Sequence, residues 1–432
     1  MNKLIFTFIV LFCLNSCSFN ENSRIWKDKE NRLENNKNIT KVFSEEKKNI
    51  SEFNKDLKLD LSSIKTNNKI VDNMNNFGPQ NYTAKLNKIG NYKFSKFDEI
   101  NSLDLKPSFL KDGIIFFDKK GTVVRYNNNK KILWKKNHYS KSERKLQPKL
   151  NFLTSNQNLL VTDNIAKYYS VNLNTGELNW SKYNIYPFNS DIKKHNNRIF
   201  VIDYKNILRC YKIDDGSECW NLQTEDSFII SDIKYSLIIF NNNVIFSNSI
   251  GDITAVDIET GLIVWQLPTQ SSSIINETHK FKMSKLVSDN NSIFFSNNKN
   301  EFYSIDLNSG TINWINEIDS ILTPILLRDL ILTVSEDGYL YVVDKNKGNI
   351  LRITDLFSNY KDKKRKNIYP IGFTIGNNNL FLSNSDGKMI VAGIEDGKVI
   401  QIEKVSGGLI SKPFIFNNNL YVVRNGSIVK YD

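Results

Sequence analysis

The sequence predicts an all-β protein, an eight-bladed β-propeller of four-stranded antiparallel blades, and three observations support this prediction. First, a short apolar or alternating run follows turn-forming residues eight times, beginning near residues 112, 157, 197, 242, 291, 329, 378 and 418. Successive runs begin 38 to 49 residues apart, a period that accommodates four short strands and their turns. Second, β-branched and aromatic residues dominate these runs, and helical periodicity is absent. Third, one turn motif recurs in nearly every period.

The turn motif is clearest in FYSIDLNSGTINW at residues 302–314, and TAVDIETGLIVW at 254–265 repeats it closely. In the first copy, Asp306 is suited to accept backbone hydrogen bonds across the turn. Gly310 closes such a turn in the left-handed conformation without a Cβ clash. Trp314 ends the returning strand. We expect its indole to pack against the neighbouring blade rather than against a cofactor.

The number of motif copies gives the number of blades. Seven copies end at residues 134, 180, 220, 265, 314, 352 and 401, and an eighth, SIVKYD, stops at Asp432 before its last strand. Residues 82–93 lie about one period before the first motif end, so we expect them to supply the missing strand. Such pairing closes the ring and removes exposed strand edges. The propeller is therefore predicted to span residues 81–432.

The amino terminus resembles a bacterial lipoprotein signal. A positively charged start precedes an apolar run at residues 4–14, which is too short for a stable membrane anchor. The run leads into the letters LNSC, which are similar to a lipobox although Asn15 departs from the usual small residue. The resemblance implies that residues 1–16 are a cleaved signal peptide, that Cys17 is lipidated, and that the protein is anchored to the periplasmic face of the outer membrane. An ordinary signal peptide is the alternative.

Residues 17–80 differ in composition from the rest of the chain. They are rich in Lys, Asn, Glu and Ser and contain few apolar residues, so a packed core is not expected there. We interpret this segment as a disordered, lipidated tether that holds the propeller away from the membrane. A partly amphipathic helix within residues 39–61 is the alternative.

The formal net charge of +12 and the pI near 9.2 do not indicate nucleic-acid binding here. Lysine is abundant along the whole chain, and an exported protein does not meet nucleic acid. Two denser basic runs, 130–145 and 361–366, are interpreted as solvated loops. An anionic membrane surface or an acidic partner is the second interpretation of these runs.

Of the four cysteines, two remain after signal cleavage and lipidation, Cys210 and Cys219. They lie on the two arms of one predicted hairpin, LRCYKIDDGSECW. Either a disulfide, formed in the oxidising periplasm, or two separate packed thiols fits this placement. Both alternatives are structural rather than catalytic.

The motif of a strand, D-x-x-[TS]-G and tryptophan resembles the repeat of pyrroloquinoline-quinone-type propellers. With eight blades and a lipobox, residues 80–432 and the signal most resemble the BamB family within that class. The resemblance implies a non-enzymatic scaffold of the outer-membrane β-barrel assembly machinery, a monomer within a hetero-complex. It also implies that this scaffold binds the periplasmic domains of the barrel subunit BamA and aids insertion of outer-membrane proteins.

The family's docking loops correspond to residues 226–236 and 271–286 of this chain. The first segment keeps an apolar-then-polar character in the candidate partner-binding residues Phe228, Ile229, Ile230 and Asp232. The second lacks the acidic pair expected from the family and carries lysines instead. The resemblance therefore transfers the docking region rather than individual contacts. A buried outer strand is the alternative explanation of the apolar residues.

A quinoprotein dehydrogenase is the competing interpretation. Such an enzyme needs acidic and amide ligands for calcium, a carboxylate base, residues that stack on the cofactor and often adjacent cysteines, and this chain has no adjacent cysteines. The histidines His138, His195 and His279 fall in separate predicted connections. We therefore predict no catalytic residue, cofactor, metal or small-molecule substrate. A propeller that binds cell-wall polymer or another envelope protein is a third interpretation.

Overall fold

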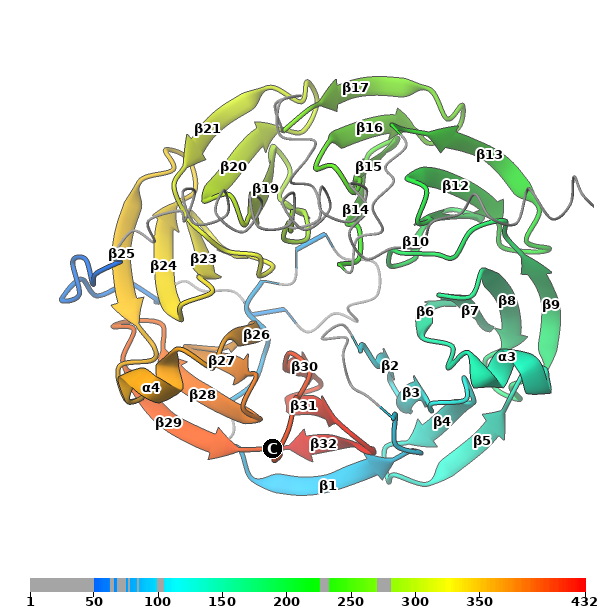
Figure 1. Cartoon of the computed structure of the whole chain (residues 1–432), viewed down its shortest axis with the longest axis horizontal. Helices are drawn as coiled ribbons and strands as arrows, with labels where there is room; N and C mark the ends of the chain where they lie inside the picture. Colours follow the sequence, from blue (N-terminus) through cyan, green and yellow to red (C-terminus); the bar gives the residue numbers. More distant parts are fainter. Residues whose placement is uncertain are drawn as a thin grey trace, which may run out of the picture. The chain divides into compact units, whose positions relative to one another are not determined.

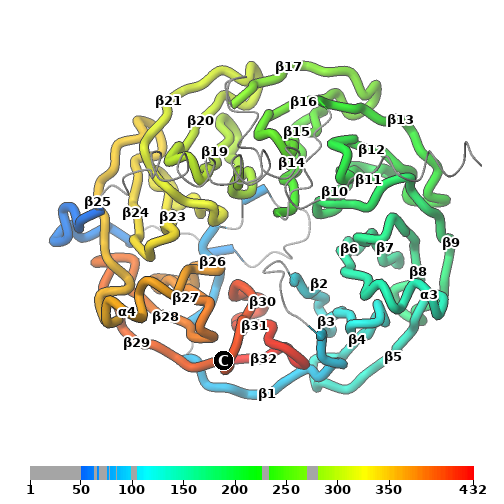
Figure 2. Tube along the Cα trace, viewed as in Figure 1, coloured from blue at the N-terminus to red at the C-terminus, as the bar shows by residue number. Residues whose placement is uncertain are grey.

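A computed structural model describes residues 50–62, 66–67, 75–76, 78–83, 85–98, 105–225, 233–269 and 281–432. Among the described residues from 52 onward, thirty-two strands form eight four-stranded antiparallel sheets, which are arranged as blades around a ring (Figure 1). The path of the chain runs once around this ring (Figure 2). The predicted eight-bladed propeller is therefore confirmed. In the described part of the chain, no helix has the length and hydrophobicity needed to cross a bilayer.

The first four blades follow one another in sequence, each from its inner to its outer strand. Blade 1 contains β2 (Ser108–Leu110), β3 (Gly113–Phe117), β4 (Val123–Asn127) and β5 (Ile132–Lys136), and blade 2 contains β6 (Leu150–Ser155), β7 (Asn158–Asp163), β8 (Lys167–Asn172) and β9 (Leu178–Tyr183). Blade 3 contains β10 (Lys193–His195), β11 (Arg198–Ile202), β12 (Ile207–Lys212) and β13 (Glu218–Gln223), and blade 4 contains β14 (Leu237–Phe240), β15 (Asn243–Ser247), β16 (Ile253–Asp257) and β17 (Ile263–Leu267).

The remaining blades repeat the same order. Blade 5 contains β18 (Val287–Ser288), β19 (Ser292–Asn297), β20 (Glu301–Asp306) and β21 (Ile312–Asn316), and blade 6 contains β22 (Ile325–Leu327), β23 (Leu330–Val334), β24 (Tyr339–Asp344) and β25 (Ile350–Asp355). Blade 7 contains β26 (Pro370–Gly376), β27 (Asn379–Asn384), β28 (Lys388–Gly393) and β29 (Val399–Lys404), and blade 8 contains β30 (Phe414–Phe416), β31 (Asn419–Arg424), β32 (Ser427–Tyr431) and β1 (Lys88–Lys93). Two short helices, α3 (Lys141–Lys145) and α4 (Asp362–Arg365), lie between blades in the sequence.

Blade 8 closes the ring, because β1 from the start of the propeller pairs antiparallel with β32 from its end. The backbones of Asn87 and Asp432 exchange two hydrogen bonds of 3.0 Å at one end of this pairing. Tyr92 of β1 is buried and packs against Tyr126 of blade 1 and Tyr421 of blade 8, with ring centroids 5.5 and 6.5 Å away. The strand predicted within residues 82–93 is therefore confirmed.

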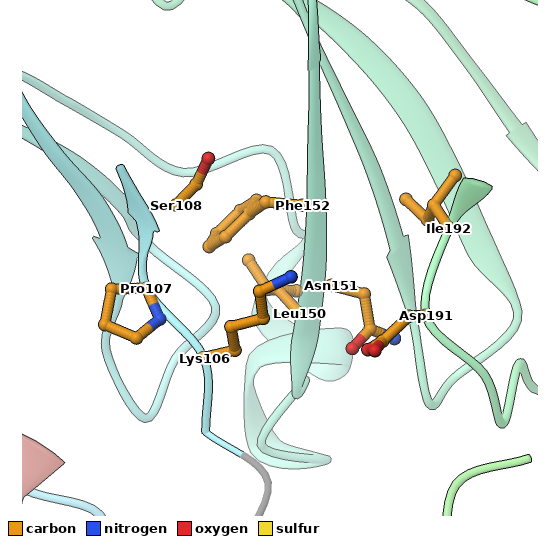
Figure 3. Close-up of a pocket in the computed structure, with 8 residues that line it drawn as sticks. All are labelled: Lys106, Pro107, Ser108, Leu150, Asn151, Phe152, Asp191 and Ile192. Carbon is orange, nitrogen blue, oxygen red and sulfur yellow. The ribbon is translucent and has the colours of Figure 1, made fainter. Parts of the chain in front are cut away.

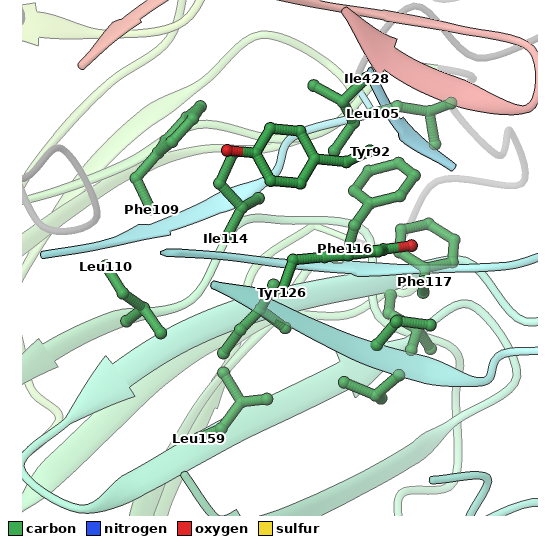
Figure 4. Packing of buried hydrophobic residues seen from close by; sticks show 14 of the residues in the cluster. Tyr92, Leu105, Phe109, Leu110, Ile114, Phe116, Phe117, Tyr126, Leu159 and Ile428 are labelled. Atoms are coloured by element: carbon green, nitrogen blue, oxygen red, sulfur yellow. The ribbon is translucent and has the colours of Figure 1, made fainter. Parts of the chain in front are cut away.

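The hydrophobic core lies between the blades rather than at one central point. Figure 4 shows the cluster at the closure, where residues from blades 8, 1 and 2 pack together. It includes Tyr92, Phe109, Phe116, Leu159 and Ile428, which are all at most 2% exposed. Because neighbouring blades share such clusters, burial of apolar area holds each blade to the next.

The recurring tryptophans join neighbouring blades, as the sequence predicts. Each indole packs on the motif glycine of the next blade, in the pairs Trp134–Gly176, Trp180–Gly216, Trp220–Gly261, Trp265–Gly310 and Trp314–Gly348. Four indole N–H groups also donate to a carbonyl in that turn, in the pairs Trp134–Leu173, Trp180–Ile213, Trp220–Ile258 and Trp314–Lys345, at 3.0 to 3.1 Å. Only glycine allows the indole to approach this closely, since a Cβ at these positions would lie within 3.0 Å of the indole.

Arg352 takes the place of the tryptophan in blade 6. Its guanidinium is fully buried and donates to the carbonyls of Ile394 (2.8 Å) and Glu395 (2.5 Å) in blade 7. A third bond, of 2.8 Å, goes to the carbonyl of Leu57. Arg352 therefore joins two blades and also fixes a segment that precedes the propeller.

Several described residues between 52 and 80 contact the ring. Phe53 exchanges two backbone hydrogen bonds, of 3.1 and 3.0 Å, with Ile353 on the outer edge of β25. The Gln80 N–H donates to Ile375 of β26. Residues 50–61 contain no helix. The signal peptide 1–16, Cys17 and the tether up to residue 49 lie outside the described residues and stay predictions. From residue 52 onward, the described part of the predicted tether follows the surface of the propeller.

Candidate functional site

The two predicted docking segments are described only in part. Phe228, Ile229, Ile230 and Asp232 lie outside the described residues, as does the start of the 271–286 segment. The described ends, 233–236 and 281–286, lead directly into the inner strands β14 and β18. The role of the four candidate residues therefore stays a prediction, whereas the position at which their segment enters blade 4 is known.

The ends of the two segments lie against each other. The backbone N–H of Leu286 donates to the Ser236 hydroxyl at 2.7 Å, and the Ser236 N–H donates to Ser247 at 3.0 Å. The N–H of Tyr235 donates to the carbonyl of Asn189 in the connection before blade 3, at 2.8 Å. The inner ends of blades 3, 4 and 5 are thus joined by hydrogen bonds where the predicted docking segments arrive.

Lysines from several blades converge on Asp191 at this place. Lys285 Nζ lies 2.9 Å from one carboxylate oxygen of Asp191, and Lys234 Nζ lies 3.8 Å from the other. Lys234 also donates to Asn151 Oδ1 at 2.6 Å. Although burial opposes ionisation, Lys285, Lys234 and Lys106 hold the pKa of Asp191 well below its usual range. Asp191 is therefore a stable carboxylate.

This cluster lies near the centre of the ring. Lys285 precedes blade 5 and Asp191 precedes blade 3, so their ion pair spans the intervening blade 4, which is feasible only where the inner strands converge (Figure 1). Figure 3 shows the adjoining pocket, lined by Lys106, Pro107, Ser108, Leu150, Asn151, Phe152, Asp191 and Ile192. The Asp191 and Lys285 side chains are 29% and 22% exposed, so solvent reaches both.

A second polar cluster is buried between blades 1 and 2. The Tyr139 hydroxyl donates to Asp163 Oδ2 at 2.6 Å, and the N–H groups of Ile165 and Lys167 donate to Asp163 Oδ1 at 2.9 and 2.8 Å. Asp163 is fully buried, and this burial raises its pKa to about 6 despite the three hydrogen bonds. Lys167 is paired instead with Glu143, 3.4 Å away. The cluster is part of the interface between the two blades.

The three histidines named in the sequence analysis do not form a metal or catalytic site in the part of the chain that the structure describes. His138 packs against Tyr169, with ring centroids 5.4 Å apart, and burial lowers its pKa. His195 ends β10, and His279 lies outside the described residues. Among the described residues, no three His, Cys, Asp or Glu side chains are grouped so as to hold a metal ion.

Cys210 and Cys219 lie together in blade 3 and are both free thiols in this structure. Cys210 is fully buried, whereas Cys219 is partly exposed. Burial and the neighbouring Cys219 thiol both raise the pKa of Cys210. The structure therefore places Cys219 against the buried cluster that contains Cys210, and the disulfide stays a prediction.

The family model described as outer membrane protein assembly factor BamB matches residues 119–354, more than half of the chain. The chain belongs to this BamB family. The matched residues run from blade 1 to blade 6 and include both predicted docking segments and the residues Asp191, Lys234 and Lys285. Among curated proteins, no sequence matches the chain significantly.

Solved structures share the propeller fold of this chain. BamB from Moraxella catarrhalis aligns with a TM-score of 0.63 and 16% identity, over 81% of this chain and 98% of that one. The C-terminal WD40 domain of Sif2 aligns with a TM-score of 0.59 and 11% identity, over 80% and 98%. Quinohemoprotein alcohol dehydrogenase ADHIIG from Pseudomonas putida HK5 aligns with a TM-score of 0.53 and 11% identity, over 80% and 75%. At these identities, the likeness shows the fold alone.

The Asp191 cluster was not predicted from the sequence, although the repeat contains a signal for it. Asp191, Lys285 and Lys412 each follow a serine and stand two residues before the inner strand of their blade. Each of these serines donates its hydroxyl to the carbonyl of the charged residue that follows it. Alignment of the blades at this serine identifies one position that carries charge near the centre of the ring.

Proposed function

We propose that this protein is a non-enzymatic scaffold lipoprotein of the outer-membrane β-barrel assembly machinery. In this proposal, it binds the periplasmic domains of the BamA-type barrel subunit and aids insertion of outer-membrane proteins. Lipidation of Cys17 anchors it to the periplasmic face of the outer membrane. The match of the BamB family model to residues 119–354 is the observation that carries the proposal.

The described ends of the docking segments support a rigid docking platform. Segments 226–236 and 271–286 enter adjacent blades and are tied together through Leu286, Ser236 and the Lys234–Asp191–Lys285 ion pairs. A surface whose supports are fixed before binding loses less conformational entropy when a partner docks. We therefore assign the contact with the barrel subunit to these two segments.

Affinity purification of the native lipoprotein from mildly solubilised envelopes tests the proposal. We expect the barrel subunit to co-purify, and we expect mass spectrometry to find acyl chains on Cys17. A preparation that retains pyrroloquinoline quinone with calcium and reduces dye would contradict the scaffold assignment and favour a quinoprotein dehydrogenase. Retention of cell-wall polymer or another envelope protein, without the barrel subunit, would favour the third interpretation.

A further inference from the structure

A β-bulge recurs in the outer hairpin of blades 1 to 7, where the outer strand contains one more residue than its partner. In blade 2, Ser170 pairs with Trp180 and the next residue pairs with Leu178, so that Asn179 is the additional residue. In blade 5 the additional residue is Asn313. In blade 3 it is Cys219, which immediately precedes Trp220.

The bulged residue contacts one particular residue of the third strand. Asn179 Nδ2 donates to Ser170 Oγ at 3.0 Å, and Asn313 Nδ2 donates to Ser304 Oγ at 3.2 Å. In both blades the two partners are nine positions apart in the sequence, and the serine is buried. In these two blades, the geometry of the bulge therefore brings the two side chains within hydrogen-bonding distance.

Blade 3 has cysteines at both of these positions. Cys210 corresponds to Ser170 and Ser304, and Cys219 corresponds to the two asparagines, again nine positions apart. Cys210 belongs to a buried hydrophobic cluster, and the partly buried Cys219 and Trp220 pack against that cluster. The backbone thus holds two thiols where other blades hold a hydrogen-bonded pair.

We propose that Cys210 and Cys219 form a disulfide in the exported protein. This inference rests on the proposed function for the oxidising compartment. Cys219, the more exposed cysteine, attacks the disulfide of an oxidised thiol–disulfide oxidoreductase as a thiolate and forms a mixed disulfide. The Cys210 thiol then loses its proton and attacks Cys219 Sγ, which releases the oxidoreductase as a dithiol. Together, the two protein thiols lose two electrons and two protons, and the oxidoreductase disulfide takes up these two electrons and two protons.

The disulfide has a defined structural consequence. Trp220 follows Cys219 directly, packs on Gly261 of blade 4 and donates to the carbonyl of Ile258 at 3.0 Å. A bond between Cys210 and Cys219 fixes the bulge that orients this indole. The docking segment 226–236 begins shortly after the same strand, β13. The disulfide therefore stiffens the junction of blades 3 and 4, just before that segment in the sequence.

Two preparations test the disulfide. In the first, the native lipoprotein is alkylated without reductant and digested, and we expect a peptide cross-linked between Cys210 and Cys219. In the second, the full chain purified from a reducing cytosol is incubated with glutathione disulfide, and we expect the same cross-link. Either of two results would overturn the inference. One is free thiols in lipoprotein that carries acyl chains on Cys17, and the other is failure of the purified chain to form the Cys210–Cys219 cross-link.

The two preparations also separate this inference from the proposed function. Native protein with free thiols and no acyl chain on Cys17 contradicts export and therefore the proposed function. In that case, formation of the Cys210–Cys219 bond in the purified chain still decides whether the disulfide inference holds. The double variant Cys210→Ser with Cys219→Asn is a matched control, because it installs the pair found in blades 2 and 5. We expect reductant to lower the Tm of the oxidised wild-type protein by several degrees and to leave the Tm of the variant unchanged. Equal Tm values of the wild-type protein with and without reductant would count against the disulfide.

Discussion

The indole N–H of Trp314 in blade 5 donates to the carbonyl of Lys345 in blade 6 at 3.1 Å, across the junction of two blades. Trp265 packs on the next blade in the same way, yet its indole nitrogen has no hydrogen-bond partner among the residues that the structure describes. The two tryptophans therefore allow ring packing and hydrogen bonding to be measured separately.

Replacement of Trp314 by Phe is expected to cost about 1 kcal/mol more in unfolding free energy than Trp265→Phe, because only the first change removes a hydrogen bond. Loss of ring area is similar in the two variants. Equilibrium urea denaturation gives the difference. Equal losses in the two variants would show that packing alone joins the blades.

The motif glycines are expected to be intolerant of a side chain. Gly310 has a φ of +71°, and a Cβ there would lie 2.5 Å from Cε3 of Trp265. We expect Gly310→Ala to lower the free energy of unfolding by roughly 2–4 kcal/mol, from backbone strain and overpacking together. Gly407→Ala, where a Cβ meets nothing within 4 Å, is the control and should change stability little. An unchanged free energy of unfolding in Gly310→Ala would contradict the close contact between Gly310 and the Trp265 indole.

Arg352 is expected to resist replacement by lysine. A lysine ammonium lacks the planar fork that reaches the carbonyls of Leu57, Ile394 and Glu395, so we expect a loss of about 2–4 kcal/mol. Hydrogen exchange should also become faster at the Leu59 N–H, which donates to Glu395. The control is Arg198→Lys, since Arg198 is more exposed and we expect a change below about 1 kcal/mol. Unchanged exchange at Leu59 would argue against this role of Arg352.

Asp163 is expected to make stability depend on pH. Its folded pKa of about 6 lies above the value of an unfolded aspartate, so the folded state binds a proton first as pH falls. Relative to Asp163→Asn, the wild-type protein should therefore gain up to about 3 kcal/mol in unfolding free energy between pH 7 and pH 4. Chemical denaturation of both variants across this range measures the gain. A constant difference between them would indicate that Asp163 stays ionised.

The predicted docking residues are expected to affect partner binding without affecting the fold. Combined alanine substitution of Phe228, Ile229, Ile230 and Asp232 should reduce co-purification of the barrel subunit at least about tenfold, a loss of 1.4 kcal/mol or more. The control replaces Ile132 and Leu133, exposed apolar residues on the outer strand of blade 1, by alanine. Retained binding in the first variant, or an equal loss of binding in the control, would show that segment 226–236 does not make the contact with the barrel subunit.

Repeated features of this fold were predictable from the sequence, and unrepeated features were not. The blade number and the β1–β32 closure were predicted because each blade contains the same turn, which is visible at every period. The backbone contacts of Phe53 and Gln80 are isolated bridges that leave no periodic pattern. The Asp191–Lys285 ion pair joins residues 94 positions apart on non-adjacent blades, so only the closed ring brings them together. Individual docking contacts could not be predicted either, because the repeated motif does not determine which residues lie on the docking surface.

The pairing of β1 with β32 has a consequence for the order of events during synthesis. Lys93 and Ser427 are neighbours in the sheet, yet more than three hundred residues separate them along the chain. As the polypeptide emerges from the ribosome or a translocon, blades 1 to 7 can assemble one after another, whereas the eighth waits for its final strand. Until then β1 has no partner, and blades 1 and 7 each expose to chaperones an apolar face that blade 8 covers in the complete ring.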